Sequence, residues 1–470
     1  MPPPDAAAPH DFPLLPPGFR FGTSTASYQI EGAVAEDGRG PSIWDTFAAE
    51  PGRVAGGATG EVACDHYHRV DEDVALMKEL GTGGYRFSIA WPRIQPTGRG
   101  PANEKGLAFY DRLIDTLLAN GQEPMVTLYH WDLPQALEDR GGWLDRGTAE
   151  AFADYAAVVH DRLGDRVSSW ATHNEPWCAA YLGYAAGVHA PGRREGEAGH
   201  RAAHHLLLGH ALVRQALPDA HLGIVLNLAP VWAETADAEE VADGVDAIRN
   251  RVWLDPLVDG AYDERLLAVA PVLADPDLVR PGDLEAMRGS IDWVGINYYT
   301  PIRPAVFTGQ GEAHPEQGAY PGVPPLDLVV REPRTDIGWE VEPRGLEELL
   351  VETHRRVGVP LVVTENGAAM ADTDVVDGVV QDDDRISYIQ DHLAAVDRAR
   401  RAGADVRGYF AWTLMDNFEW AEGYAKTFGL VHVDRSSPLL TRTPKASYHW
   451  FADRAAPARG RARAAGLITP

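Results

Sequence analysis

Short apolar runs of strand length alternate with longer amphipathic segments along most of this 470-residue chain. Eight such runs occur, at residues 19–24, 85–89, 124–129, 168–173, 222–226, 291–296, 361–364 and 406–412. Between them, segments such as 107–120 and 386–402 place apolar side chains at helical spacing and end next to a glycine. Eight strands alternating with helices are typical of a closed parallel barrel. The pattern predicts an α/β fold, a single (β/α)8 TIM barrel over residues 12–454.

An open, doubly wound sheet is the alternative that the same alternation permits. Dinucleotide-binding sheets of that class carry a Gly-x-Gly-x-x-Gly turn after an early strand, and no such turn follows the first runs. Polar or aromatic side chains instead lie at, within or just after the ends of all eight runs: Gln29, Arg86, His130 with Trp131, Asn174 with Glu175, Asn227, Asn297 with Tyr299, Glu365, and Trp412. A barrel gathers the carboxyl ends of its strands on one catalytic face, so this regularity favours the barrel.

Two of the runs deliver a glutamate to that face. The fourth run leads into Asn174-Glu175-Pro176, and the seventh leads into Glu365. Because Pro176 restricts the residue before it, we expect extended backbone at Glu175 and the end of the strand there. Two carboxylates on one rim are the requirement for glycoside hydrolysis, although salt bridges or helix caps explain two such glutamates equally well.

Irregular stretches follow particular strands and are predicted to form the outer end of the pocket, where a leaving group would lie. They cover residues 53–60, 192–199 and 300–335, and the last is rich in Pro and Gly. Residues 1–11 are expected to form a flexible N-terminal tail, and residues 455–470 a frayed C-terminal tail. No internal repeat or linker divides the chain between these tails.

The charge and cysteine content exclude several classes of protein. The net charge of −27, from 69 acidic and 42 basic residues, repels nucleic acid and anionic membranes. Only Cys64 and Cys178 are present, too few for a disulfide framework, and Cys178 is expected to fill a pocket wall. No apolar stretch approaches the ~20 residues of a membrane span, and the N-terminal residues lack the features of a signal peptide. We therefore expect a cytoplasmic protein.

Histidines and tryptophans are the remaining candidates for site chemistry. His200 and His204 have helical i, i+4 spacing, but without a Glu between them or an evident third ligand, helix packing is the preferred interpretation over a metal site. A neutral His130 at the third strand end could donate to a sugar hydroxyl. Glu419 beside Trp420 fits a sugar clamp, in which a carboxylate accepts two hydroxyls and an indole stacks on the ring.

Taken together, these motifs resemble glycoside hydrolase family 1, a family of barrel-shaped β-glycosidases. The resemblance extends from about residue 12 to about residue 451. It rests on Phe-Arg-Phe-Gly-Thr-Ser-Thr-Ala-Ser-Tyr-Gln-Ile-Glu-Gly at 19–32, Tyr-Arg-Phe-Ser-Ile-Ala-Trp-Pro-Arg at 85–93, Tyr-His-Trp-Asp-Leu-Pro at 129–134, Thr-His-Asn-Glu-Pro at 172–176, Asn-Tyr-Tyr at 297–299, Thr-Glu-Asn-Gly at 364–367 and Asn-Phe-Glu-Trp at 417–420.

The resemblance implies a retaining double displacement, with Glu175 as the general acid/base and Glu365 as the nucleophile. It also implies supporting roles: Asn174 binds the sugar 2-hydroxyl, Tyr299 donates to Glu365, and Arg86 lies beneath Glu365 and keeps it ionised, with Asn297 nearby. The sugar-binding residues that it implies are Gln29, His130, Trp131, Trp412, Glu419, Trp420 and Phe428, with Trp177 and Trp339 beside the leaving group.

The expected substrates are neutral β-D-glucosides, including aryl glucosides, cellobiose and short cello-oligosaccharides, with some action on β-fucosides and β-galactosides. The chemistry requires no metal or organic cofactor, and no nucleic-acid or membrane partner is expected. A 6-phospho-β-glycosidase and a non-catalytic sugar-binding relative are the alternatives. The preferred leaving group and the oligomeric state are left open by the sequence.

Overall fold

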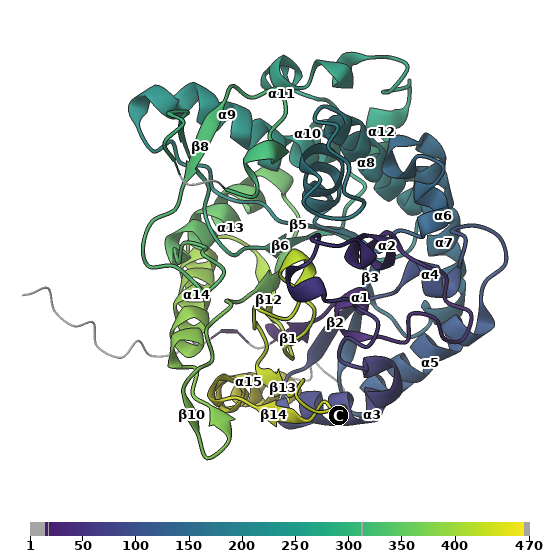
Figure 1. The fold of residues 1–470 in the computed structure, drawn as a ribbon, viewed down its shortest axis with the longest axis vertical. Coiled ribbons are helices and arrows are strands. Elements are labelled where there is room, and N and C mark those ends of the chain that lie inside the picture. Colours follow the sequence, from purple (N-terminus) through teal and green to yellow (C-terminus); the bar gives the residue numbers. More distant parts are fainter. Residues whose placement is uncertain (1–14, 17, 312–313, 465–470) are drawn as a thin grey trace, which may run out of the picture.

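Eight parallel strands close into a barrel at the centre of the molecule (Figure 1). The computed structural model describes residues 15–16, 18–311 and 314–464, with side chains to residue 455. Around the barrel the strands follow the order β1-β12-β9-β6-β5-β4-β3-β2. Their bounds are β1 (Arg20–Ser24), β2 (Gly84–Ser88), β3 (Glu123–Tyr129), β4 (Ser169–Asn174), β5 (Leu222–Leu226), β6 (Trp293–Asn297), β9 (Leu361–Asn366) and β12 (Val406–Trp412). The prediction of a (β/α)8 barrel is confirmed.

The outer layer consists of helices that follow the strands and cover the barrel on all sides (Figure 1). The longer ones are α3 (His66–Leu80), α5 (Glu104–Ala119), α7 (Arg146–Leu163), α8 (Ala198–Ala216), α10 (Val252–Asp259), α13 (Pro343–Val357), α14 (Asp383–Arg401) and α15 (Ala446–Ala464). The apolar stripe of α5 faces inward as predicted, with Leu107, Leu113 and Leu117 buried. Helix α5 thus covers the barrel with one face and leaves its polar face to water.

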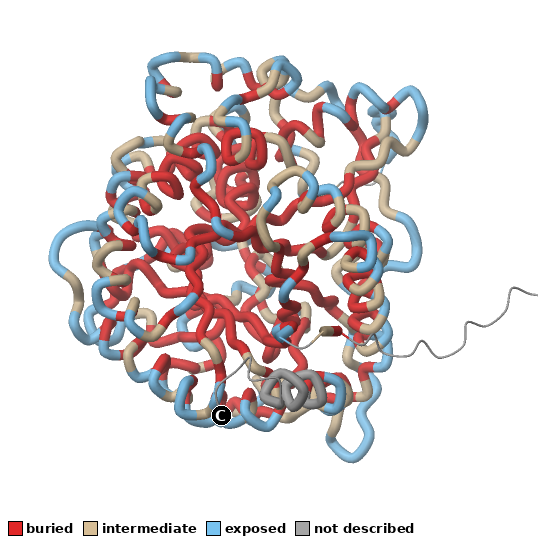
Figure 2. The backbone as a smooth tube through the Cα atoms, turned by 180° about the vertical axis from the view of Figure 1, so that it is seen from behind, coloured by how far each residue is buried: buried red, intermediate tan, exposed pale blue. Residues whose placement is uncertain are grey.

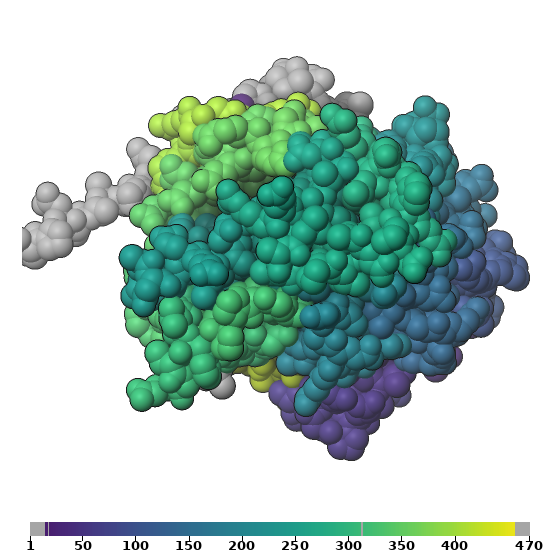
Figure 3. All heavy atoms as spheres, turned by 90° about the horizontal axis from the view of Figure 1, so that it is seen from above, coloured from purple at the N-terminus to yellow at the C-terminus, as the bar shows by residue number. Residues whose placement is uncertain are grey.

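Shorter helices and hairpins fill the connections at the carboxyl ends of the strands. The helical ones are α1 (Ser27–Ile30), α2 (Ile43–Ala49), α4 (Trp91–Ile94), α6 (Gln135–Glu138), α9 (Glu239–Asp246), α11 (Glu264–Val269), α12 (Asp283–Met287) and two π-helical segments, η3 (Cys178–Ala186) and η5 (Ala247–Arg251). A hairpin, β7 (Arg303–Val306) and β8 (Leu326–Val329), lies in the long stretch predicted as a loop. Figure 3 shows the teal and green atoms of the middle of the chain spreading across one face.

Most predicted strands begin or end within one residue of the observed ones, and β6 departs furthest. It begins at Trp293 rather than at residue 291. The reason is Asp292, whose carboxylate accepts the Leu222 backbone N–H (2.8 Å) and pairs with Arg214 (2.5 Å). A side chain that takes the place of a backbone acceptor ends the regular ladder there.

The barrel interior is packed with apolar side chains at one end. Met125, Ala171, Val225, Trp293, Val362 and Phe410 form a buried cluster of their own, separate from the larger core between strands and helices. Glycines make room for the large rings: a Cβ at Gly22 would lie 2.4 Å from the Phe410 ring, and one at Gly223 would lie 2.4 Å from Trp293. Figure 2 shows this continuous buried centre inside a largely exposed rim. This cluster fills one end of the barrel, and the cavity lies at the other end.

A buried ionic network fixes two loops of the pocket to the C-terminal helix. The Lys445 ammonium, just before α15, is fully buried and contacts Asp372 (2.5 Å) and Asp416 (2.8 Å). Asp372 follows β9 and Asp416 follows β12, so one cation joins the loops after both strands. Arg385 of α14 also pairs with Asp372, at 2.9 Å. The loops that carry the candidate site are thereby held by charge as well as by packing.

The predicted tails fall partly beyond the described residues. Residues 1–11 lie outside them, as do residues 465–470. The segment predicted as a C-terminal tail begins inside α15, which continues to Ala464.

Histidines of α8 take part in packing, as the sequence indicated. His204 contacts the Tyr262 hydroxyl (3.0 Å) and Asp283 (3.1 Å), and His205 bonds to the Trp143 carbonyl (2.9 Å). Each of these bonds ties α8 to a neighbouring segment of the outer layer.

Candidate active site

A cavity of about 220 Å³, partly open to solvent, lies at the carboxyl ends of the strands. Twelve of the predicted site residues line it: His130, Trp131, Asn174, Glu175, Asn297, Tyr299, Trp339, Glu365, Trp412, Glu419, Trp420 and Phe428. These residues come from six segments that are far apart in the sequence. Closure of the barrel brings them together, because all its strands point the same way.

Glu365 lies at the end of β9 and is held by a cation and a phenol. Its Oε1 is 2.5 Å from Nη1 of Arg86, and its Oε2 accepts the Tyr299 hydroxyl at 2.7 Å. The Arg86 side chain is fully buried on β2 and also donates to Oδ1 of Asn174 (2.7 Å). A carboxylate with both oxygens engaged in this way has one orientation and is stabilised in its charged form.

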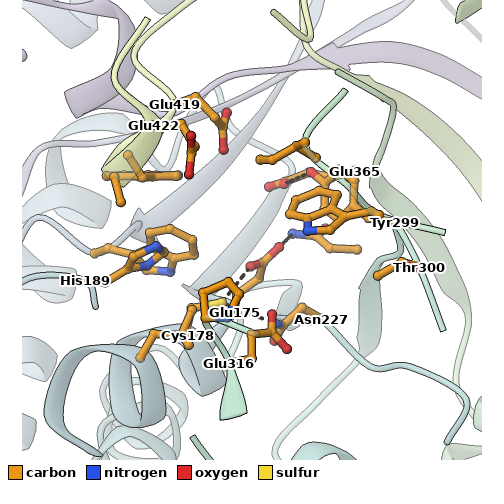
Figure 4. A pocket seen from close by; sticks show the side chains of 18 of the residues that line it. Glu175, Cys178, His189, Asn227, Tyr299, Thr300, Glu316, Glu365, Glu419 and Glu422 are labelled. Carbon is orange, nitrogen blue, oxygen red and sulfur yellow. Dashed lines mark hydrogen bonds between the residues drawn. The ribbon is translucent and has the colours of Figure 1, made fainter. Parts of the chain in front are cut away.

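Glu175 lies across the pocket, and its two oxygens have different neighbours (Figure 4). Oε1 accepts the Asn297 amide at 2.7 Å, and Oε2 accepts the Cys178 thiol at 3.2 Å. Cys178 therefore contributes to the pocket wall, as predicted, and also contacts the carboxyl group. No arginine or lysine forms an ion pair with Glu175 among the described residues.

The backbone of Glu175 corrects one expectation. The proline that follows predicted extended geometry, but Glu175 has φ of +45°, in the left-handed region. Its N–H donates to the Val225 carbonyl of the neighbouring strand at 2.8 Å, so pairing with β5 holds the backbone in this position. Trp131 and Trp420, which also line the cavity, have φ of +74° and +46°. Three residues of the pocket thus have uncommon backbone conformations.

The surroundings separate the proton affinities of the two glutamates. Burial, and then the nearby charge of Glu365, raise the pKa of Glu175 to about 7. Burial also raises the pKa of Glu365, but the charge of Arg86 and hydrogen bonds from Tyr299 and Arg86 oppose it. Because Glu365 alone of the pair has a bonded cation, it ionises first and Glu175 keeps its proton. Such a difference between two carboxyl groups is what a pair of one nucleophile and one acid requires.

A hydrogen-bond network orients Asn174 and His130 toward the cavity. Oδ1 of Asn174 accepts from Arg86 and from the Asn297 amide (2.9 Å), while its own amide donates to Nε2 of His130 at 2.9 Å. Burial lowers the pKa of His130 well below its usual value, so the ring is neutral. With Nε2 accepting, the proton is on Nδ1, which has no partner among the described residues. The Nδ1–H is therefore a neutral, buried donor on a side chain that lines the cavity.

Glu419 is a third carboxyl group in the cavity. Burial, and then the charges of Glu365 and Glu175, raise its pKa to about 8. Trp420 follows it and packs against Trp131, with ring centroids 4.4 Å apart. On the other side, Trp339 packs against Tyr299 (5.2 Å) and Phe428 (5.9 Å). The pocket therefore combines carboxyl groups with broad aromatic walls, a composition suited to sugar rings.

Three predicted residues do not line the cavity. Arg86 lies beneath Glu365, as expected. Gln29 is fully buried and donates to the Phe418 carbonyl (2.8 Å), so it supports the segment that carries Glu419. Trp177 is fully buried, with its ring under the Arg249 guanidinium at 3.9 Å. The expectation that Trp177 flanks the leaving group does not fit this position, because the π-helical start of η3 turns its side chain into the core.

The outer wall contains residues that sequence reasoning missed. They are Leu182, Val188, His189, Leu228, Arg249, Thr300, His314, Pro315, Glu316, Ile337, Ala421 and Glu422. Most follow the strand ends by several residues, in π-helical segments or loops without periodicity. One signal in the sequence could have found two of them. Residues 300–335 were predicted to lie at the outer end of the pocket, and this stretch contains Thr300 and Glu316.

Neither a metal centre nor a membrane-spanning helix is found in the part of the chain that the structure describes. There, no group of three His, Cys, Asp or Glu side chains is placed to hold an ion. The helices of that part are too short or too polar to cross a bilayer.

Comparison with known proteins gives one consistent result. Residues 12–458 match the family described as Glycosyl hydrolase family 1. The chain is 47% identical to a bifunctional β-D-glucosidase/β-D-fucosidase of Bifidobacterium breve, over 93% of this chain and 97% of that protein. It is 45% identical to a β-glucosidase of an Agrobacterium species, over 93% and 94%. The crystal structure of a psychrophilic β-glucosidase from Micrococcus antarcticus superposes with a TM-score of 0.89 at 45% identity, covering 94% of this chain and 98% of that one.

Replacing Glu365 by Gln should lower the pKa of Glu175. The substitution removes the like charge that helps to raise this pKa to about 7, and it leaves Arg86 unpaired nearby. We expect a fall of roughly one pH unit or more. Titration of 13C-labelled glutamate carboxyls by NMR measures it, with the exposed Glu72→Gln variant as the control. A pKa that stays the same or rises would show that the two carboxyls are not coupled.

Proposed function

We propose that this chain, which belongs to glycosyl hydrolase family 1, is a retaining β-glucosidase whose catalytic pair is Glu365 and Glu175. The substrates are terminal, non-reducing β-D-glucosyl residues of aryl glucosides, cellobiose and short cello-oligosaccharides. The observation that carries the proposal is the asymmetry of the pair: Arg86 and Tyr299 engage one carboxylate, while the other has no ion-pair partner among the described residues. The same asymmetry argues against a sugar-binding relative without catalysis.

In the first step, Glu365 attacks the anomeric carbon and the bond to the leaving oxygen breaks. The Tyr299 hydroxyl and Arg86 hold the attacking carboxylate in place. Glu175 transfers its proton to the leaving oxygen as that bond breaks, so the alcohol departs neutral. A glycosyl ester on Glu365 results, with the anomeric centre inverted once.

In the second step, water hydrolyses the ester. Once Glu365 is esterified, its negative charge is gone, and the like charge that raised the pKa of Glu175 disappears with it. Glu175 is then ionised at neutral pH and removes a proton from the water that attacks the anomeric carbon. This second inversion restores the β-configuration and returns both glutamates to their starting states.

Residues around the pair stabilise the sugar in the transition state. Asn174 is oriented by Arg86, Asn297 and His130, so it binds the 2-hydroxyl without further rearrangement. His130, which lines the cavity and is bonded to Asn174, gives the ring hydroxyls a second neutral polar neighbour. Glu419 accepts or donates at the far side of the sugar, while Trp420 and Trp412 provide apolar faces.

The range of sugars follows from where these contacts lie. β-D-Galactosides differ from glucosides only at C4, and β-D-fucosides differ at C4 and also lack the 6-hydroxyl, so both keep the contacts at C2 and at the anomeric centre. Action on both is part of the proposal, and the name of the Bifidobacterium breve relative includes a β-D-fucosidase activity. A cytoplasmic location stays a prediction from the sequence.

Replacing Glu175 by Ala should slow substrates with poor leaving groups most. General acid catalysis contributes roughly 10²–10⁴-fold, and a nitrophenolate needs little of it. We therefore expect hydrolysis of cellobiose to fall far more than glycosylation by 2,4-dinitrophenyl β-glucoside. Steady-state kcat/KM for both substrates, with the exposed Glu72→Ala variant as control, measures the difference. Equal losses on both substrates would remove Glu175 from the acid role.

Hydrolysis of nitrophenyl β-glucoside should exceed that of its 6-phosphate. Lys426, the cation nearest to Trp420 in the sequence, is engaged by the Asp336 carbonyl (2.6 Å) and carboxylate (2.9 Å) and does not line the cavity. A phosphate would lie instead near the carboxyl of Glu419. A like-charge pair at ~4 Å costs on the order of 4 kcal/mol at an effective dielectric of ~20, and protonation of Glu419 reduces this cost. We expect at least a ~10-fold preference for the glucoside.

The ratio of kcat/KM values at pH 7 measures this preference, and the Glu419→Gln variant serves as the matched comparison. In that variant the preference should narrow, because the fraction of Glu419 that is ionised at pH 7 no longer repels the phosphate. A higher value for the phosphate in the unmodified enzyme would assign the chain to 6-phospho-β-glycosides instead.

A further inference from the structure

Arg249 is a buried cation in the pocket wall that the two-glutamate mechanism does not use. It belongs to the π-helical segment η5, is 8% exposed and lines the cavity. Its Nε donates to the Asn227 carbonyl at 3.0 Å, and its guanidinium lies 3.9 Å above the centre of the Trp177 ring. Nη1 is 3.5 Å from the Glu316 carboxylate and has no hydrogen-bond partner among the described residues. A cation that is buried and only loosely paired in this way is costly to remove from water.

Asn227 connects Arg249 to the Glu175 carboxyl. The Asn227 amide donates to the sulfur of Cys178 at 3.2 Å, and the Cys178 thiol donates to Oε2 of Glu175 at 3.2 Å. Figure 4 shows Glu175, Cys178 and Asn227 next to one another, with Glu316 beside them. Arg249 thus fixes the backbone of the residue whose side chain orients the thiol. These contacts run from Arg249 through Asn227 and Cys178 to Oε2 of Glu175. The other oxygen, Oε1, is bonded to Asn297.

We propose that Arg249 is a positioning residue for Glu175: it holds the Asn227–Cys178 pair against the carboxyl and supplies the positive charge on that side of the pocket. This inference rests on the proposed function, in which Glu175 must first give up a proton and then take one back. A nearby cation favours the ionised form of a carboxyl group. Arg249 therefore opposes burial and Glu365, which both raise the pKa of Glu175.

Glu316 opposes Arg249 from the loop after β6. Its carboxylate offsets part of the arginine's charge and ties this loop of the outer wall to η5. The same pair therefore couples the leaving-group end of the pocket to the acid/base side. Removing Arg249 should therefore raise the pKa of Glu175, and removing the Glu316 charge should lower it.

Other charged or titratable groups also face this pair and stay unchanged in the test. Those that influence Glu175 and Arg249 come from several strands and loops: Glu365, Cys178, Tyr299, Glu419 and Tyr320. None of them is altered in the variants below. A difference in the pKa of Glu175 between variants therefore comes from the change to Arg249 or Glu316.

Arg249→Met should move the basic limb of the kcat/KM profile to higher pH. Loss of the cation raises the pKa of Glu175, and we expect a shift of roughly half a pH unit or more. Arg249→Lys keeps the charge but loses the fixed bond to Asn227, so its shift should be smaller. Glu316→Gln should move the limb to lower pH, because the charge of Arg249 is then no longer offset. All profiles use nitrophenyl β-glucoside and folded protein verified by thermal melting.

Arg265→Met is the matched control, because Arg265 is an exposed arginine of α11 that pairs with Asp243 (3.2 Å) and does not line the cavity. A basic limb in Arg249→Met that matches this control would overturn the proposal, as would a uniform loss of activity without a shift. If Arg249→Met does not fold, the Glu316→Gln variant decides: a basic limb at lower pH supports the proposal, and an unchanged or higher one overturns it. NMR titration of Glu175 in the same variants is independent of turnover, so an inactive wild type would contradict the proposed function but not this inference.

Discussion

Arg86 and Glu365 reach each other across the mouth of the barrel, from strands β2 and β9, which are separated in the barrel order by β1 and β12. Both side chains are almost completely withdrawn from water, so each charge is tolerable only because the other is 2.5 Å away. Only a closed barrel brings these strands into this relation. The same guanidinium also holds Asn174, and through it His130, so one buried cation orients three groups that line the cavity.

Opposite this ion pair, the pocket keeps carboxyl groups without bonded cations. Glu175 and Glu419 have raised pKa values, about 7 and about 8, because both are buried near the charge of Glu365. Burial, together with the field of one ionised carboxylate, thus favours the protonated form of the two others. When that carboxylate is esterified, the field disappears, and Glu175 can change from acid to base. The left-handed backbone of Glu175, Trp131 and Trp420 shows that local conformation yields to these requirements.

The sequence allowed the barrel and the inner half of the pocket to be predicted, since both follow from periodicity and from polar residues at strand ends. Glu365, Asn297 and His130 are where the strand pattern placed them. The backbone of Glu175 was predicted wrongly, because pairing with β5 overrides the local preference set by Pro176. Trp177 was placed wrongly from the sequence and Arg249 was missed, because they lie just before and inside π-helical segments whose side-chain directions depend on tertiary packing.

The product formed by a Glu365→Gly variant with azide tests the two-glutamate account most directly. Without the carboxylate no glycosyl ester can form, so the variant alone should be inactive on 2,4-dinitrophenyl β-glucoside. Azide fits the space left by the side chain and attacks from the same face, so turnover should return and yield the α-glucosyl azide by one inversion. Full activity without azide, or a β-glucosyl azide as the product, would contradict the assignment of Glu365 as the nucleophile.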